Sequence, residues 1–134
     1  MRVVVGAALL DGTGRVLVAR RRRPPGWEFP GGKVEPGESE VDALVRECRE
    51  ELGVTVAVAD RLGPDAPLDG GWTLRVWTGR VTAGEPTPHE HAELRWVPYP
   101  ELDSLDWLPG DLPAVAALTA AAPGPAAVSR SRRR

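Results

Sequence analysis

Residues 31–54 read GGKVEPGESEVDALVRECREELGV, and this stretch decides the fold because it joins a glycine-rich turn to the clearest helix of the chain. The helix is predicted over residues 39–52: Ser39 caps it, Asp42 takes the capping-box position, and Gly53 ends it. Apolar residues recur along it at the spacing of one buried stripe, formed by Val41, Leu44, Val45, Cys48 and Leu52. The sequence therefore predicts an amphipathic helix directly after the turn.

Three glutamates of this helix, Glu47, Glu50 and Glu51, share one quadrant of its surface, away from the apolar stripe. Like charges at these spacings repel each other, and we expect this face to point towards solvent. Three hard oxygen donors on one side are what a magnesium or manganese site requires, and the preceding glycines allow a backbone carbonyl to join them. On spacing alone, a solvated acidic face is the alternative to a metal site.

Apolar and β-branched runs, separated by glycine- and proline-rich segments, predict the other elements. Strands are expected at residues 3–10, 16–20, 54–59, 72–81 and 92–97, with a short extended piece at 27–30. Loops are expected at residues 20–25, 64–71 and 82–89, a short helix at 100–105, and an alanine-rich helix at 112–122. Strands on both sides of a central helix, followed by a terminal helix, predict one mixed α/β layered domain.

Length and composition narrow the class of protein. The 134 residues fit one domain, and an apolar fraction of 42% is enough for a single packed core. No apolar run reaches the roughly 20 residues of a membrane-spanning helix, and no secretory signal is expected at the start. The lone Cys48 excludes an internal disulfide and a cysteine-based metal cluster. We therefore expect a cytoplasmic protein without a membrane partner.

The charge is divided unevenly along the chain. The formal net charge is −2, and without the four arginines of residues 129–134 it is −6. Nucleic-acid binding needs a basic face, so the acidic body argues against a nucleic-acid partner. We expect the arginine-rich end to be solvated and without fixed structure.

The stretch resembles the Nudix box at every fixed position, namely Gly32, Glu38, Arg46, Glu47, Cys48, Glu50, Glu51, Gly53 and Val54. Cys48 fills an apolar position where an aliphatic residue is more usual, and we expect it to pack as a small hydrophobe. The preceding Trp-Glu-Phe-Pro-Gly-Gly, residues 27–32, is similar to the MutT-type branch of this family. The resemblance implies a Nudix-type α/β/α sandwich with a mixed central sheet, as a single domain over residues 1–122, followed by a flexible tail at residues 123–134.

In Nudix hydrolases that resemble this chain, the glutamates of the box hold divalent cations while water attacks phosphorus. The resemblance therefore implies Mg²⁺ or Mn²⁺ on Glu47, Glu50 and Glu51, with the carbonyl of Gly31 as a further ligand. It also implies that Glu47, Glu50 and Glu90 are the catalytic glutamates. The general base is either Glu47 or Glu90, because MutT-type enzymes carry a glutamate on the loop before the last core strand.

Two further sets of residues are expected around these glutamates. Arg46 and Glu38 are expected to support the metal ligands without binding the metal. His89 and His91 flank Glu90, and two flanking loop residues without further ligands make a poor zinc site. We interpret the histidines as facing solvent or lying near phosphate.

The resemblance also implies residues that bind the substrate. Arg21 ends the second strand where MutT-type proteins place a phosphate-contacting arginine, and Phe29 is a candidate wall of the base pocket, with Trp27 as a second. Asp111 is expected to accept a hydrogen bond from the N4 amino group of cytosine. The alternative for Asp111 is a simple cap on the helix that begins at Leu112.

The implied reaction splits a nucleoside triphosphate into a monophosphate and pyrophosphate, and the segment around residues 106–113 points to cytosine nucleotides such as dCTP, CTP or 5-methyl-dCTP. Two alternatives stay open. One is an oxidised-purine triphosphate as the substrate, and the other is a nucleotide-binding regulatory module that does not turn over. The expected partner is a small nucleotide, and a monomer and a homodimer are equally compatible with the sequence.

Overall fold

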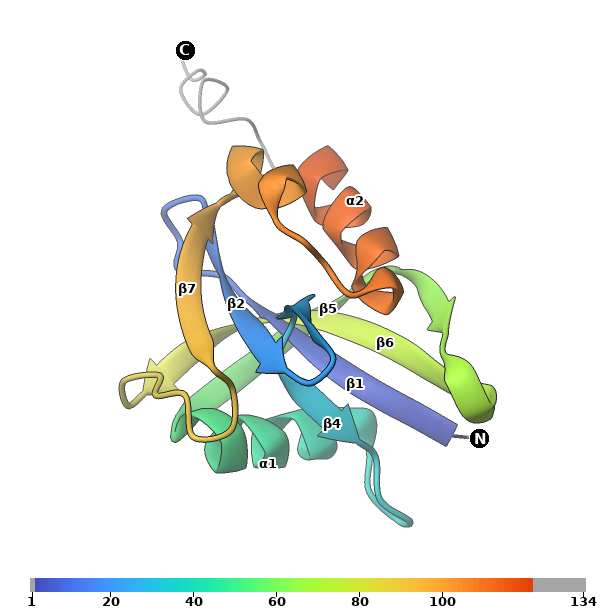
Figure 1. Cartoon of the computed structure of the whole chain (residues 1–134). Coiled ribbons are helices and arrows are strands. Elements are labelled where there is room, and N and C mark those ends of the chain that lie inside the picture. The colour runs from blue at the N-terminus through green and yellow to red at the C-terminus, as the bar shows by residue number, and fades with distance from the viewer. Residues whose placement is uncertain (1, 122–134) are drawn as a thin grey trace.

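The computed structural model describes residues 2–121, in which two β-sheets lie between two helices (Figure 1). The expectations for residues 122–134 lie outside the described residues. The first sheet has the strand order β4-β1-β6-β5, made of β1 (Arg2–Leu9), β4 (Gly31–Lys33), β5 (Thr55–Pro67) and β6 (Trp72–Ala83). In it β1 and β6 run parallel, while the other pairs are antiparallel.

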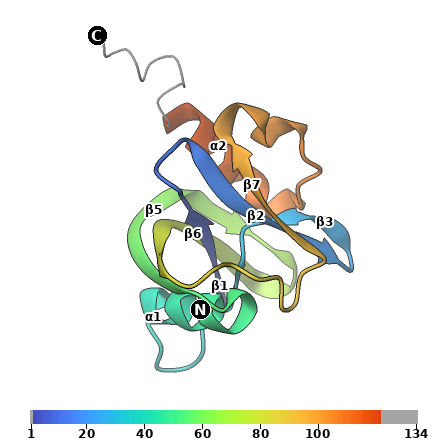
Figure 2. The same cartoon turned by 90° about the vertical axis from the view of Figure 1, so that its left-hand side faces the viewer.

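The second sheet is antiparallel, with the order β3-β2-β7, made of β2 (Arg15–Arg22), β3 (Pro25–Glu28) and β7 (Glu93–Pro98). The helices α1 (Glu40–Leu52) and α2 (Leu112–Ala121) lie on opposite sides of the strands (Figure 2). Short 3₁₀ turns complete the chain: η1 (Asp69–Gly71), η2 (Tyr99–Ser104) and η3 (Pro109–Asp111). This arrangement confirms the predicted α/β/α sandwich with mixed strands. No helix among residues 2–121 is both long and apolar enough to span a membrane.

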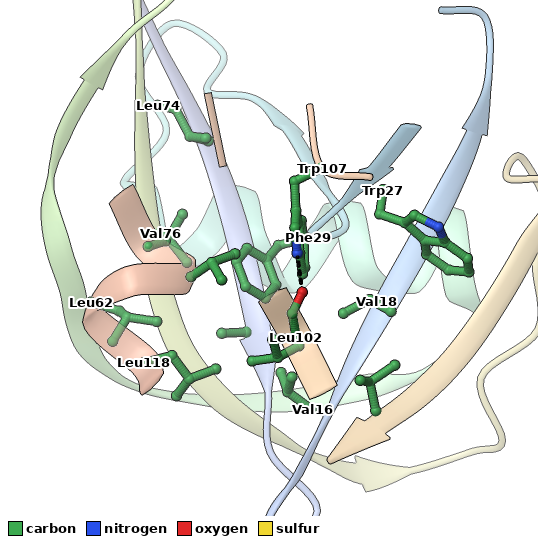
Figure 3. Close-up of a cluster of buried hydrophobic side chains, with 14 of the residues drawn as sticks. Val16, Val18, Trp27, Phe29, Leu62, Leu74, Val76, Leu102, Trp107 and Leu118 are labelled. Atoms are coloured by element: carbon green, nitrogen blue, oxygen red, sulfur yellow. Dashed lines mark hydrogen bonds between the residues drawn. The ribbon is translucent and has the colours of Figure 1, made fainter. Parts of the chain in front are cut away.

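Strand β1 separates two apolar cores because its side chains alternate between its faces. One set, Val3, Val5, Ala7 and Leu9, packs against the buried face of α1, whereas Ala8 belongs to the core beneath α2. The α2 core includes Phe29 and Trp107, whose ring centroids lie 5.0 Å apart. In Figure 3 the dashed line marks the indole N–H of Trp107 donating to the carbonyl of Leu102, at 2.8 Å.

Helix α1 begins and ends as the sequence predicts. The hydroxyl of Ser39 accepts a hydrogen bond from the backbone N–H of Asp42 at 3.0 Å, and Gly53 adopts a left-handed conformation with φ of 72°. The predicted apolar stripe is wrong at its start, because Val41 is 37% exposed in the first turn. The buried face instead continues from Leu44 through Cys48 to Glu51 and Leu52.

Two predicted loops are wrong. Gly31 and Gly32 form a strand and not a turn, because β4 pairs antiparallel with β1. A Cβ atom on Gly31 would lie 1.8 Å from the carbonyl oxygen of Val5, so glycine is needed there for close backbone approach. Strand β5 also continues to Pro67, although prolines suggested a loop. It lies at the edge of its sheet and changes register along β6, and an edge strand tolerates proline because its outer N–H groups have no partner strand.

Candidate active site

A cleft of about 1080 Å³ lies beside the segment that connects the two sheets. It is bordered by β1 and β4 of the first sheet, by the hairpin of β2 and β3, and by η3. Six of the residues expected at the site line this cleft: Arg21, Phe29, Gly31, Glu51, Glu90 and Asp111. The fold therefore brings together side chains that are up to 90 positions apart in the sequence.

Residues 29–31 hold two buried carboxylates, one from each side of the molecule. The backbone N–H of Phe29 donates to Asp111 Oδ1 at 3.1 Å, and that of Gly31 donates to Glu51 Oε1 at 3.2 Å. Between them, the carbonyl of Pro30 accepts from the N–H of Ala7 at 2.7 Å, which ties the segment to β1. One short segment thus fixes a carboxylate from α1 and a carboxylate from η3 at the same cleft.

We expected Glu51 to face solvent, and this prediction is wrong, because only 8% of its surface is exposed. It follows Cys48 by three positions and so turns towards β4 together with the buried face of α1. Burial raises its pKa to about 8, helped by the negative charges of Glu47 and Glu90, while the bond from Gly31 opposes the shift. The carboxyl of Glu51 therefore lies in a pocket where negative charge accumulates.

Glu47 and Glu50 are held by one arginine. Arg46 Nη1 donates to Glu47 Oε2 at 2.9 Å and to Glu50 Oε1 at 3.3 Å. Glu47 is half-buried, and burial raises its pKa against the opposing effect of Arg46. A Cβ atom on Gly32 would lie 2.4 Å from the carboxyl carbon of Glu47, so the missing side chain lets this carboxylate rest on the backbone of β4. Glu50 has 56% of its side chain exposed.

Arg46 itself is fixed by Glu38 from the loop before the helix. Its Nε and Nη2 donate to the two oxygens of Glu38 at 2.7 and 2.9 Å, and Nη2 also donates to the carbonyl of Lys33 at 3.1 Å. These bonds lower the pKa of Glu38 to about 2. Such a forked pair restrains both side chains, so Arg46 presents a fixed surface to Glu47 and Glu50.

The chemistry of these groups fits a hard divalent cation. Within residues 2–121, no three histidine, cysteine, aspartate or glutamate side chains are gathered closely enough to form a metal cage as they stand. Glu47 and Glu50 both lie against Arg46. Their oxygens and those of Glu51 are nevertheless hard donors, and a cation would stabilise the negative charge of Glu47 and Glu90 that adds to the effect of burial on the pKa of Glu51.

Asp111 lines the same cleft and is 5% exposed. Burial raises its pKa to about 7, while the bond from Phe29 opposes the shift. The hydrogen bond from Phe29 attaches it to another segment, so it does more than begin α2. Phe29 is packed on Trp107 beside it, and Leu68 and Leu74 line the same part of the cleft. A buried carboxylate beside these aromatic and aliphatic side chains suits a flat ring with a polar edge.

Sequence reasoning missed Glu28 and left open whether His91 faces solvent or lies near phosphate. Glu28 lines the cleft, with Oε1 3.8 Å from Arg21 Nη1. His91 is only 6% exposed, so it does not face solvent, and its Nε2 lies 2.9 Å from Glu28 Oε2. The signal was present in the sequence, because Glu28 is a charged residue between the apolar Trp27 and Phe29. Its pairing with a residue 63 positions away required the structure.

Three layers, a mixed sheet and a glutamate-bearing helix beside a cleft define this chain as a hydrolase of the Nudix type. A family model described as the NUDIX domain matches residues 1–118, and the chain belongs to this family. "Putative 8-oxo-dGTP diphosphatase 2" of Mycobacterium tuberculosis is 45% identical over 94% of both chains. The CTP pyrophosphohydrolase of Escherichia coli is 37% identical over 88% of this chain and 92% of its own.

Solved structures agree with this assignment. The crystal structure of a MutT Nudix hydrolase from Burkholderia pseudomallei is 31% identical and superposes with a TM-score of 0.76, over 87% of this chain and 97% of that one. The protein is therefore a MutT-type Nudix hydrolase and a nucleotide pyrophosphohydrolase. Nudix hydrolases in general use divalent metal ions.

Proposed function

We propose that this protein hydrolyses nucleoside triphosphates to a monophosphate and pyrophosphate with Mg²⁺ or Mn²⁺, and that cytosine nucleotides are its best substrates. The observation that carries this proposal is the buried carboxylate of Asp111, which lines the same cleft as the buried carboxylate of Glu51. The two carboxylates suit different parts of one nucleotide, with the base beside Asp111 and the phosphates beside the glutamates. We call the part of the site at Asp111 the base end and the part at the glutamates the phosphate end or metal end.

At the phosphate end, Glu47, Glu50, Glu51 and the carbonyl of Gly31 are the groups that would hold the cation. A bound divalent cation supplies charge neutralisation for the polyphosphate and activation of water. Arg46, fixed by Glu38, keeps Glu47 and Glu50 on the same side of α1.

Proton transfer and phosphate binding at this end need further residues. Glu47 or Glu90 accepts the proton of the attacking water; the raised pKa of Glu47 makes that carboxylate a better proton acceptor than an ordinary glutamate. Arg21 lines the cleft with an exposed guanidinium, whose planar group binds phosphate oxygens in pairs.

At the base end, the protonation of Asp111 matters. Its pKa of about 7 means that the carboxylate and the carboxylic acid are both populated near neutral pH. The carboxylate accepts a hydrogen bond from the N4 amino group of cytosine, and the acid in addition donates to the adjacent ring nitrogen N3. Cytosine therefore finds a partner in either form of Asp111.

The same protonation supports oxidised guanine as a second candidate, because the acid form of Asp111 is a donor as well as an acceptor. Oxidised guanine presents an N7–H donor beside its O6 acceptor, which the acid form complements. Asp111 is therefore not restricted to accepting hydrogen bonds. The name of the Mycobacterium tuberculosis relative also favours this candidate.

A panel of nucleotides separates the two candidates. The purified chain would be given dCTP, CTP, 5-methyl-dCTP, dGTP and 8-oxo-dGTP with Mg²⁺ or Mn²⁺, and the products identified by chromatography. We expect cytosine nucleotides to have the highest kcat/KM, a monophosphate and pyrophosphate as products, and no turnover in excess EDTA. A higher kcat/KM for 8-oxo-dGTP would overturn the cytosine assignment, and full turnover in EDTA would overturn the metal requirement.

A further inference from the structure

The loop that carries Glu90 is attached to the C-terminal end of α1. The N–H of Thr87 donates to the carbonyl of Leu52 at 3.0 Å, and the N–H of His89 donates to that of Glu51 at 3.2 Å. The ring Nδ1 of His89 lies 3.3 Å from the carbonyl oxygen of Glu50. These carbonyls end the helix and have no partner within it, so the loop supplies the donors that the helix lacks.

Glycine makes room for this attachment. A Cβ atom on Gly53 would lie 3.1 Å from Cε1 of the His89 ring, and the positive φ of Gly53 already favours glycine there. The imidazole therefore packs directly over the end of the helix. A hydrogen-bond donor at this position also interacts favourably with the negative end of the helix dipole.

On its other side, the loop is attached to the second sheet. His91 is buried, with Nε2 2.9 Å from Glu28 Oε2 on β3, and the N–H of Ala92 donates to the carbonyl of Arg20 on β2 at 2.9 Å. Among the described residues, His91 Nδ1 is the buried side-chain polar atom without a hydrogen-bond partner. A proton on Nε2 supplies the bond to Glu28 and leaves Nδ1 as an acceptor, which is less costly to bury unpaired than a donor.

We propose that His89 and His91 are positioning residues that together hold Glu90 over the carboxylates of α1. The proposal rests on the proposed function, in which Glu90 is a catalytic glutamate. Each histidine is adjacent to Glu90, and their two partners lie on different layers, one on α1 and one on β3. Two attachments on opposite sides restrain the residue between them more tightly than either attachment alone.

The charge of Glu90 acts on the glutamates of α1, which explains why its position matters. Glu90 is exposed, and its negative charge contributes to the raised pKa of both Glu47 and Glu51. The three carboxylates carry like charges, so their mutual interaction does not hold the loop in place. The position of Glu90 therefore depends on the attachments that the two histidines make to α1 and β3. Displacements of about 1 Å at a catalytic group can cost on the order of 100-fold in rate.

A double-mutant cycle tests the proposal. His91→Phe removes the donor to Glu28 and keeps an aromatic ring, and His89→Ala removes the contact with Glu50. Each would be made alone and combined with Glu90→Gln, and kcat, KM and thermal stability measured with the best nucleotide of the panel. Glu85→Gln, on the same loop and exposed, serves as the control.

We expect each histidine variant to lower kcat by roughly 10- to 100-fold in the wild-type background and to have little effect on kcat in the Glu90→Gln background. His91→Gln, which places an amide donor near the position of Nε2, should recover much of the loss. Equal losses of kcat in both backgrounds, or no loss in either, would overturn the proposal. A Glu90→Gln variant with normal kcat would instead remove Glu90 from catalysis, which is a failure of the proposed function.

Discussion

Glu51 and Asp111 are both buried beside one cleft, and they differ in the charges that surround them. Each accepts one backbone N–H from residues 29–31, and burial raises the pKa of each, to about 8 for Glu51 and about 7 for Asp111. After burial, the causes differ. Glu51 is surrounded by other carboxylates, of which Glu47 and Glu90 have the largest effect. Around Asp111 the neighbouring charges, led by Glu28, have a smaller effect than the bond from Phe29.

In the proposed function, this difference matches the two carboxylates with different ligands. A proton on Glu51 neutralises only one member of a group of carboxylates, so a multivalent cation stabilises the group far better. Near Asp111 the charge of Glu28 is opposed by that of Arg21, so a single proton or a single hydrogen-bond donor is enough there. The same arrangement, a buried carboxylate bonded to a backbone N–H, would thus serve metal binding at Glu51 and recognition of a base edge at Asp111.

The largest expected effect is the loss of kcat when a proposed metal ligand is replaced. Glu51→Gln and Glu50→Gln each replace a charged oxygen donor by a neutral isostere, and we expect kcat to fall by about 1,000-fold or more. Pyrophosphate release measured over a range of Mg²⁺ concentrations tests this. Glu101→Gln, an exposed glutamate far from α1 in the sequence, is the control and should keep its rate. A Glu51 or Glu50 variant with normal rate and normal metal dependence would remove that residue from the site.

The metal end is also the part of the site that the sequence predicts best. Glu47, Glu50 and Glu51 lie within five positions on one helix, so the helical repeat alone places them together. Local sequence also predicts the ends of α1, because Ser39 and Gly53 act on adjacent backbone groups. The α/β/α sandwich with a mixed central sheet followed from the resemblance to the Nudix box, whereas the order of the strands was not predicted.

What the sequence did not predict depends on contacts between distant segments. The burial of Glu51 depends on how α1 rotates against β4, which its own apolar pattern does not fix. Gly31 and Gly32 read as a turn because glycine is common there, yet here they serve the close approach of β4 to β1 and to Glu47. The pair of His91 with Glu28 joins the loop before β7 to the end of β3, and neither segment alone predicts the other as its partner.

A smaller effect is expected on base preference when Asp111 is replaced. Asp111→Ala removes the acceptor and the acid but leaves the glutamates of α1 in place. We expect the preference for cytosine nucleotides over other bases to fall by about 1–3 kcal/mol, which is roughly 5- to 150-fold in the ratio of kcat/KM values. Asp111→Asn, which keeps an acceptor for Phe29, should change the ranking of the bases with less loss of stability. An unchanged ranking in Asp111→Ala would show that Asp111 has only a structural role.

The smallest expected effect is on stability, and it tests whether both carboxylates are buried as described. The folded chain holds protons on Glu51 and Asp111 at pH values where the unfolded chain, with ordinary pKa values near 4.5 and 3.8, has released them. Their contribution to the free energy of unfolding is therefore fully present below about pH 4 and is lost as the pH rises to about 8. Without metal, Glu51→Gln and Asp111→Asn should each be about 1–2 kcal/mol more stable than wild type at pH 9 and similar at pH 4. Exposed Glu50→Gln should show no such gain, and a wild-type melting temperature that falls no faster with pH than that of Glu51→Gln would contradict the burial of Glu51.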